Sequence, residues 1–263
     1  MTEEINEKTM SVHREIAKII GDFFSERLGD IKAIGFYRGV ENDNMLKWLV
    51  THIALGEVLM VKCTKELNIV FPQKHAGMEA FVYGTENFPN QPGGVMTLGR
   101  HNPNGDLIRI MDFSINNQPD CLYLDRYPHR VNILFDIAKG KSAGFDEIDT
   151  NEIAEFIKRG FIRKNGDELK LNIPTMTNEQ YNKLKNMLDD MTTVIAEKTR
   201  ETINIATDVL VQHAPVSLKK DAENLGGVTS AFSAVIPVNI MVDNGVLQQV
   251  AENAHPTTFI MLA

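Results

Sequence analysis

Hydrophobic residues near the start of the chain recur at intervals of three and four positions. Between residues 5 and 28 this spacing predicts an amphipathic helix that packs on a core and ends near Gly29. A strand or short extended piece is expected at 31–40. A second helix is expected to begin at Asn42 or Asp43 and to run to about Lys62.

The pattern changes between residues 66 and 125, where short apolar runs alternate with clusters of Asn, Pro and Gly. The runs are at 67–71, 78–84, 94–99 and 106–113. Alternation of this kind is typical of antiparallel strands joined by hairpins. Residues 1–125 are therefore predicted to form an α+β domain, in which two helices pack against a small sheet. Ligand sensing is a candidate role for this domain.

The middle of the chain has a more specific order of elements. Helices are expected at 131–138 and 150–159, and Gly160 follows at the position where a left-handed residue commonly ends a helix. Asn165-Gly166 then stands between two alternating apolar runs, which is a strong short-range signal for a hairpin. The predicted order is helix, glycine, strand, tight turn, strand.

This order accompanies a family resemblance. The sequence EFIKRGFIRKNGDELKLNIPTMTNEQYNKL resembles the helix-and-wing half of winged helix-turn-helix proteins, and the chain looks like uncharacterised bacterial putative regulators of that type, most closely over 128–184. The resemblance implies a winged-helix-like module at 126–175, DNA binding and transcriptional control. It also implies that the helix before the wing enters the major groove.

A long helix is expected after Pro174, capped by Thr175 or Thr177 and continuing to His213, with a break near 197–201 where the sequence is wholly polar. A helix of this length at 176–213 is compatible with a homodimer contact, and equally with folding back across the N-terminal domain.

The last segment is expected to complete a helical C-terminal region over 176–263. It is predicted to contain helices at 221–235 and 242–252 and a short final strand, TTFIML.

Composition bears on the cellular location of the protein. The 263 residues carry a formal net charge of −8, and the two cysteines, Cys63 and Cys121, show no paired spacing. That usage favours a reducing, cytoplasmic location. The polar, acidic N-terminus is unlike a signal peptide, and no run approaches the roughly 20 apolar residues that span a bilayer, so no membrane partner is expected.

Charge bears on the DNA-binding prediction. From Gly144 to Lys170 there are seven acids and five bases, a balance of −2. Phosphate contacts need cations, so Glu152 and Glu155 on the reading helix weigh against DNA binding. The candidate DNA-binding residues are Thr150, Asn151, Lys158, Arg159, Arg163 and Lys164.

A second candidate site lies across the NPNG turn, where Arg100, His101 and Arg109 flank two predicted strands. If Arg100 and Arg109 stand on one sheet face, they would bind a small acidic ligand, although charged residues on a solvated hairpin explain the same pattern. The twelve methionines would suit either an apolar ligand pocket or irregular gaps in a core.

Signatures of chemistry are scarce. No phosphate-binding glycine loop, zinc spacing or nucleophile elbow occurs, so no catalytic residue, metal or cofactor is predicted. Trp48 and His52 share a helix face, which suits a stacked core pair better than a ligand site.

Three hypotheses follow from these features. The first is a transcriptional regulator whose sensing domain is coupled to a DNA-contacting winged helix. The second is a cytosolic interaction or dimerisation module that does not bind DNA. The third is an enzyme with a pocket between the two halves of the chain, and the lack of a catalytic signature disfavours it.

Overall fold

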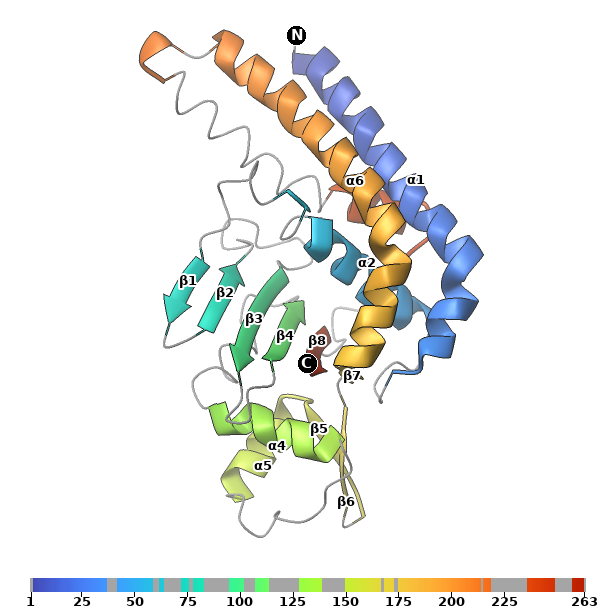
Figure 1. The fold of residues 1–263 in the computed structure, drawn as a ribbon, viewed down its shortest axis with the longest axis vertical. Helices are drawn as coiled ribbons and strands as arrows, with labels where there is room; N and C mark the ends of the chain where they lie inside the picture. Colours follow the sequence, from blue (N-terminus) through green and yellow to red (C-terminus); the bar gives the residue numbers. More distant parts are fainter. Residues whose placement is uncertain are drawn as a thin grey trace. The chain divides into compact units, whose positions relative to one another are not determined.

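The structure is a computed structural model of the 263-residue chain (Figure 1). It describes residues 2–36, 42–58, 62–63, 72–75, 78–82, 95–101, 107–113, 128–138, 150–166, 168–172, 175–213, 215–218, 236–248 and 257–262. The predicted strand at 67–71, the predicted helix at 221–235 and Cys121 lie outside the described residues.

Helices and strands are both well represented, so the chain belongs to the α+β class. The helices are α1 (Thr2–Ile34), α2 (Asp43–Glu57), α4 (Pro128–Ala138), α5 (Thr150–Lys158) and α6 (Asn178–His213), with a 3-10 turn η3 at Val216–Leu218 and a further helical stretch at 236–243. The strands are β1 (Pro72–His75), β2 (Met78–Val82), β3 (Val95–His101), β4 (Leu107–Phe113), β5 (Ile162–Asn165), β6 (Glu168–Leu171), β7 (Thr175–Thr177) and β8 (Thr257–Leu262).

Six of these strands form one sheet in the order β1-β2-β3-β4-β8-β7. The first four pair antiparallel with their sequence neighbours, as the turn-rich sequence predicts. The C-terminal strand β8 pairs antiparallel with β4 and parallel with β7, so the sheet is mixed rather than purely antiparallel. The predicted final strand is therefore confirmed and lies inside the sheet.

The chain divides into two compact units, and each is built from three separate segments. The first unit comprises Met1–Ala33, Asn44–Val70 and Leu184–Gln249, and the second comprises Ile34–Asp43, Phe71–Lys183 and Val250–Ala263. The sequence prediction divided the chain into consecutive parts and grouped the first two helices with the sheet. The contacts instead group those helices with most of α6.

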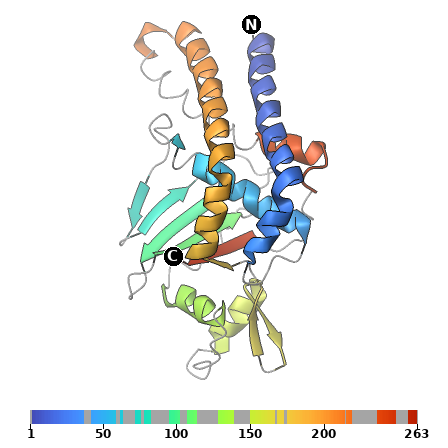
Figure 2. The same ribbon diagram turned by 45° about the vertical axis from the view of Figure 1, so that its right-hand side comes forward.

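The first unit is a helical assembly in which α1 and α6 run side by side in opposite directions (Figures 1 and 2). The apolar stripe of α1 is buried at Val12, Ile16, Ala17, Ile20, Phe24 and Ile31. The matching stripe of α6 is buried at Leu184, Leu188, Met191, Ile195, Ala196 and Ile203. Lys198 of α6 pairs with Glu15 of α1 at 2.6 Å, which fixes the two helices against each other at the surface.

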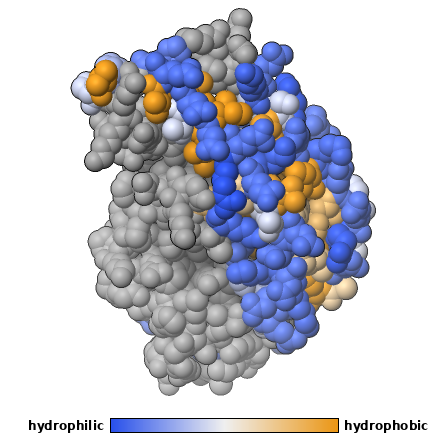
Figure 3. All heavy atoms as spheres, turned by 45° about the horizontal axis from the view of Figure 1, so that its top comes forward, coloured by the Kyte–Doolittle hydropathy of each residue, from blue (hydrophilic) through white to orange (hydrophobic). Residues whose placement is uncertain are grey.

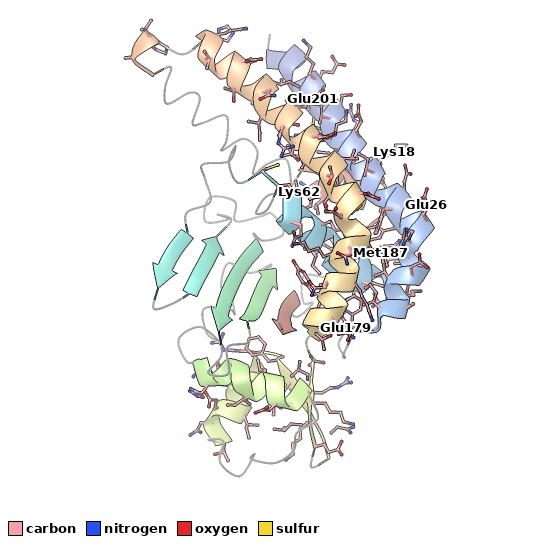
Figure 4. The ribbon with its side chains drawn as sticks, in the orientation of Figure 1. Lys18, Glu26, Lys62, Glu179, Met187 and Glu201 are labelled. Atoms are coloured by element: carbon pink, nitrogen blue, oxygen red, sulfur yellow. The ribbon has the colours of Figure 1, made fainter. Side chains whose placement is uncertain are left out.

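Lys62 lies five residues after the end of α2 and binds α6 through its side chain and its backbone (Figure 4). Its ammonium donates to the backbone carbonyl of Asp189 at 3.1 Å and to its carboxylate at 2.8 Å. Arg200 of α6 donates in turn to the backbone carbonyl of Lys62 at 2.5 Å. The described surface in Figure 3 is mostly hydrophilic, as expected for helices whose apolar stripes face inward.

Helix α1 does not end near Gly29, and the extended piece predicted to begin at 31 is wrong over 31–34. Ile31 is fully buried and continues the apolar stripe, which favours another helical turn. Gly35, with φ +67°, takes the left-handed conformation that ends the helix. Residues 37–40 of that prediction lie outside the described residues.

Helix α6 begins with a reciprocal cap, as the sequence predicts for Thr177. The Gln180 backbone donates to the Thr177 hydroxyl at 3.1 Å, and the Thr177 backbone donates to the Gln180 side chain at 2.7 Å. The break predicted near 197–201 is wrong, because the helix is continuous to His213. Thr199 is buried and Lys198 pairs with Glu201 at 3.4 Å, so this polar stretch is anchored on both sides.

The helix predicted at 242–252 is wrong over 244–248, which form a turn, because 242–243 are the end of the helical stretch that begins at 236. Gly245, with φ +71°, ends the preceding helix, and the Val246 backbone donates back to Met241 at 2.9 Å. The chain then returns to α2, where the Trp48 indole donates to the Gln248 carbonyl at 2.9 Å. Among the described residues, no helix is long and apolar enough to cross a membrane.

Candidate nucleic-acid interface

A small module within the second unit consists of α4, α5 and the hairpin β5–β6. Helix α4 contacts β6 and helix α5 contacts β5. Six apolar side chains of this module are buried, five from these elements and Phe161 from the link between α5 and β5: Leu134, Ile137, Phe156, Phe161, Ile162 and Leu171. The module therefore has a core of its own, which holds α5 and the hairpin in a fixed arrangement.

The link between α5 and the hairpin is a Schellman motif, the hydrogen-bonded C-cap of a helix. Gly160 has φ +73°, its backbone donates to Ile157 at 3.0 Å, and the Phe161 backbone donates to Phe156 at 3.0 Å. The rings of Phe156 and Phe161 pack edge to face with centroids 6.1 Å apart. The predicted role of Gly160 is confirmed, and the hairpin leaves the helix at a defined angle.

The predicted hairpin is confirmed, with the difference that Asn165 belongs to β5 and pairs with Glu168, so only Gly166 of the Asn-Gly dipeptide lies in the turn. Gly166 has φ +64°, and β5 pairs antiparallel with β6. The paired residues Ile162 and Leu171 are buried at its base. Arg163, Lys164, Asn165 and Gly166 are all exposed, so the tip presents two cations to solvent.

Glu152, in the first turn of α5, is held by helix α4 rather than presented to solvent. Its carboxylate accepts a hydrogen bond from Arg130 at 2.7 Å, and the His129 ring lies 3.1 Å and 3.2 Å from its two oxygens. The side chains of Arg130 and Glu152 are 15% and 14% exposed. This pairing could not be predicted from local sequence, because 22 positions separate the two residues.

Glu155 of α5 is paired with two cations, one at the end of the helix and one just after it. Its carboxylate accepts from Arg159 at 2.8 Å and lies 3.5 Å from the ammonium of Lys158. Desolvation raises the pKa of Glu155, but the Arg159 hydrogen bond and the charges of Lys158 and Arg159 together hold that pKa below its ordinary value. The two acids that weighed against DNA binding are thus both paired with cations of the same module.

None of the exposed positions of α5 is an acid, and the carboxylate of Glu155, 30% exposed, lies beside them paired with Arg159. The exposed residues are Thr150, Asn151, Ala154, Ile157 and Lys158. Positions 150, 154 and 158 are successive turns of one helix face, and the other two flank it. Of the predicted DNA-binding residues, Thr150, Asn151 and Lys158 therefore share one face, whereas Arg159 is turned to Glu155.

The second candidate site is placed by the register of β3 and β4. Arg100 lies opposite Ile108, and Arg109 lies opposite Gly99. Because neighbouring positions of a strand alternate between faces, Arg100 and Arg109 belong to opposite faces of the sheet. His101 and Arg109 share a face instead. The predicted binding of an acidic ligand required both arginines on one face, and the register does not place them so.

Trp48 and His52 of α2 pack against each other in the first unit. The rings of Trp48 and His52 stack with centroids 5.4 Å apart, and burial lowers the pKa of His52 to about 3. That arrangement fits the core pair favoured by the sequence. Across the described part of the chain, no three His, Cys, Asp or Glu side chains gather as a metal site would require.

Helix α6, the predicted homodimer contact, has a largely polar exposed face. Among its described side chains, Val194 is the only large hydrophobic residue that is exposed. Most of its apolar stripe is used within the first unit, so the homodimer stays a prediction.

Comparison with known proteins adds no relative. No family model, no curated protein and no solved structure matches the chain.

Proposed function

We propose that residues 128–177 form a winged helix-turn-helix that contacts duplex DNA, and that the protein is a transcriptional regulator. In this proposal α5 is the reading helix and the β5–β6 hairpin is the wing. The order of helix, helix and hairpin and the small core beneath them support it. The resemblance of this stretch to bacterial regulators of the winged type points in the same direction.

One observation carries the proposal: the acids of α5 are neutralised by cations of the same module. With Glu152 bound to Arg130 and Glu155 to Arg159, the exposed positions of α5 present hydroxyl, amide, apolar and ammonium groups, and the carboxylate of Glu155 beside them, 30% exposed, is paired. Pairing of both acids with cations reduces the repulsion that such a helix would meet in the electronegative major groove. The net acidity of the whole chain is then no obstacle, because only the contacting face matters.

Phosphate contacts are assigned to three exposed cations. Arg163 and Lys164 lie at the wing tip, and the Lys158 side chain is 77% exposed at the end of α5. Three such contacts predict a salt dependence with a slope of about −2.7 on a double-logarithmic plot. Affinity would then fall about 40-fold between about 50 mM and about 200 mM salt.

The test is equilibrium binding of the full chain to random-sequence duplex DNA over that salt range. The variant Arg163→Glu/Lys164→Glu should bind more weakly at every salt concentration and show a slope of about −0.9. The control Arg14→Glu/Lys18→Glu makes the same charge change on exposed residues of α1 and should bind like the wild type. The absence of binding by the wild type at about 50 mM salt, or equal losses in both variants, would overturn the proposal.

A further inference from the structure

We infer that α5 reads A·T base pairs, recognising the methyl group of thymine through Ala154 and Ile157. This inference rests on the proposed function, because it specifies the bases that the reading helix would contact. It comes from the chemistry of the exposed face of α5, and the wing cations play no part in it.

The face is apolar at its centre. Ala154 and Ile157 are both exposed, and Ile157, at 40% exposure, is one of three large hydrophobic side chains exposed in the described part of the chain. The neighbouring Phe156 is fully buried and contacts Phe161, so the orientation of α5 is fixed by the core. The exposed Ile157 is therefore held on the outer face of the helix and is not free to turn inward.

In the major groove, the apolar feature of a base pair is the C5 methyl group of thymine. Side chains such as Ala and other apolar residues contact that methyl group, whereas guanine is read chiefly by Arg or Lys. The exposed face of α5 has no arginine, since Arg159 is turned to Glu155 at 2.8 Å. Its one lysine, Lys158, lies at the far end of the helix near Glu155.

The polar residues of the same face agree with this preference. Asn151 and Thr150 are exposed in the first turn of α5, the part of a reading helix that lies closest to the base edges. An amide is the side-chain group that matches the paired donor and acceptor of adenine. The face thus offers partners for both members of an A·T pair, and its one cation, Lys158, lies at the end of the helix, where the proposed function assigns it to phosphate.

The experiment begins with selection of binding sites from a random duplex library by the full chain at about 100 mM salt. The expected result is an enriched motif that contains a short run of A·T pairs. Each thymine of the enriched site is then replaced by deoxyuridine, which removes only the methyl group. Loss of a methyl group that is buried against Ala154 or Ile157 should weaken binding about 4-fold at that position.

Two variants identify the side chain responsible. Ile157→Ser should bind the thymine and deoxyuridine sites equally at the position that it contacts in the wild type. Val194→Ser changes another exposed apolar residue, on α6, and should keep the wild-type ratio between the two sites. Because both side chains are already exposed, neither substitution removes a core residue.

The outcomes separate the inference from the proposed function. If the chain binds no duplex at all, the proposed function fails and the inference fails with it. If it binds but enriches G·C-rich sites or no motif, DNA binding stands and the A·T reading is overturned. An A·T motif that tolerates deoxyuridine at every position would also overturn methyl recognition, because it would indicate readout of DNA shape.

Discussion

The ion pair between Arg130 and Glu152 should contribute more to the stability of the α4–α5 module than any other described ion pair within it. Its atoms are 2.7 Å apart, and both side chains are about one-seventh exposed. Two unit charges about 4 Å apart interact by about 4 kcal/mol at an effective dielectric constant of about 20. Removing Arg130 leaves Glu152 desolvated, but residual exposure and the adjacent His129 ring limit the loss, so the cost should be about 2 kcal/mol, below the roughly 3 to 5 kcal/mol for a fully buried pair.

The perturbation is Arg130→Met, which keeps the apolar stem of the side chain and leaves the carboxylate of Glu152 without its closest partner. The assay is native-state hydrogen exchange of peptides from α5, because unfolding of a chain with two compact units is not a two-state process. A loss of about 2 kcal/mol corresponds to exchange about 30-fold faster in α5.

Two further variants serve as controls for this measurement. Arg159→Met breaks a more exposed pair, 31% and 30% exposed, and should accelerate exchange only about 2- to 4-fold. Arg130→Met/Glu152→Gln should exchange more slowly than Arg130→Met alone, because no carboxylate is then left buried without its partner. Equal effects of Arg130→Met and Arg159→Met would refute the reasoning, and so would a double variant less stable than the single one.

Three further predictions concern stability. Gly160→Ala should cost about 1 to 2 kcal/mol in local exchange of α5, because φ is +73° there, whereas Gly29→Ala should stabilise the helical Gly29 position by about 0.5 to 1 kcal/mol. Ile195→Ala, at a fully buried position, should cost the first unit about 2 to 5 kcal/mol in urea unfolding reported by Trp48 of that unit, while Val194→Ala should change the same free energy by less than about 0.5 kcal/mol. Burial lowers the pKa of His52 from its ordinary 6.5 to about 3, so the folded state favours the neutral ring. The contribution of His52 to the free energy of unfolding is therefore fully present above pH 6.5 and is lost as the pH falls toward 3. Acidification from pH about 7 to about 5 should therefore lower the urea midpoint, and less so in His52→Asn; an identical pH dependence in both proteins would contradict this.

The elements that could be predicted from the sequence are those fixed by neighbouring residues. Asn165-Gly166 specifies its hairpin within four positions, and Gly160 ends α5 through bonds to the residues just before it. The cap of α6 likewise needs only Thr177 and Gln180. Each of these signals is local, so no knowledge of the tertiary fold was required.

The features that escaped prediction depend on residues far apart in the chain. A glycine such as Gly29 is a common helix end, but burial of Ile31 stabilises one more helical turn. The helix therefore ends at Gly35 instead. The position of β8 between β4 and β7 depends on pairing across most of the chain. Composition alone cannot supply such contacts.

The charge of the candidate interface escaped prediction for the same reason. A count of acids and bases treats Glu152 as a repulsive group, whereas its partner Arg130 belongs to another helix 22 positions away. The count was correct, but the pairing decides which charges reach the surface. Similarly, Arg100 and Arg109 flank one turn in sequence, and only the register assigns them to opposite faces of the sheet.

The most direct test of the central claim is hydrogen exchange of the full chain with and without a saturating random-sequence duplex at low salt. Contact through the reading helix and wing predicts slower exchange in peptides covering 150–158 and 162–171, with exchange in α1 and in the 184–213 part of α6 unchanged. Protection confined to those long helices, or no protection anywhere while DNA is bound, would contradict the assignment of the interface to α5 and the β5–β6 hairpin.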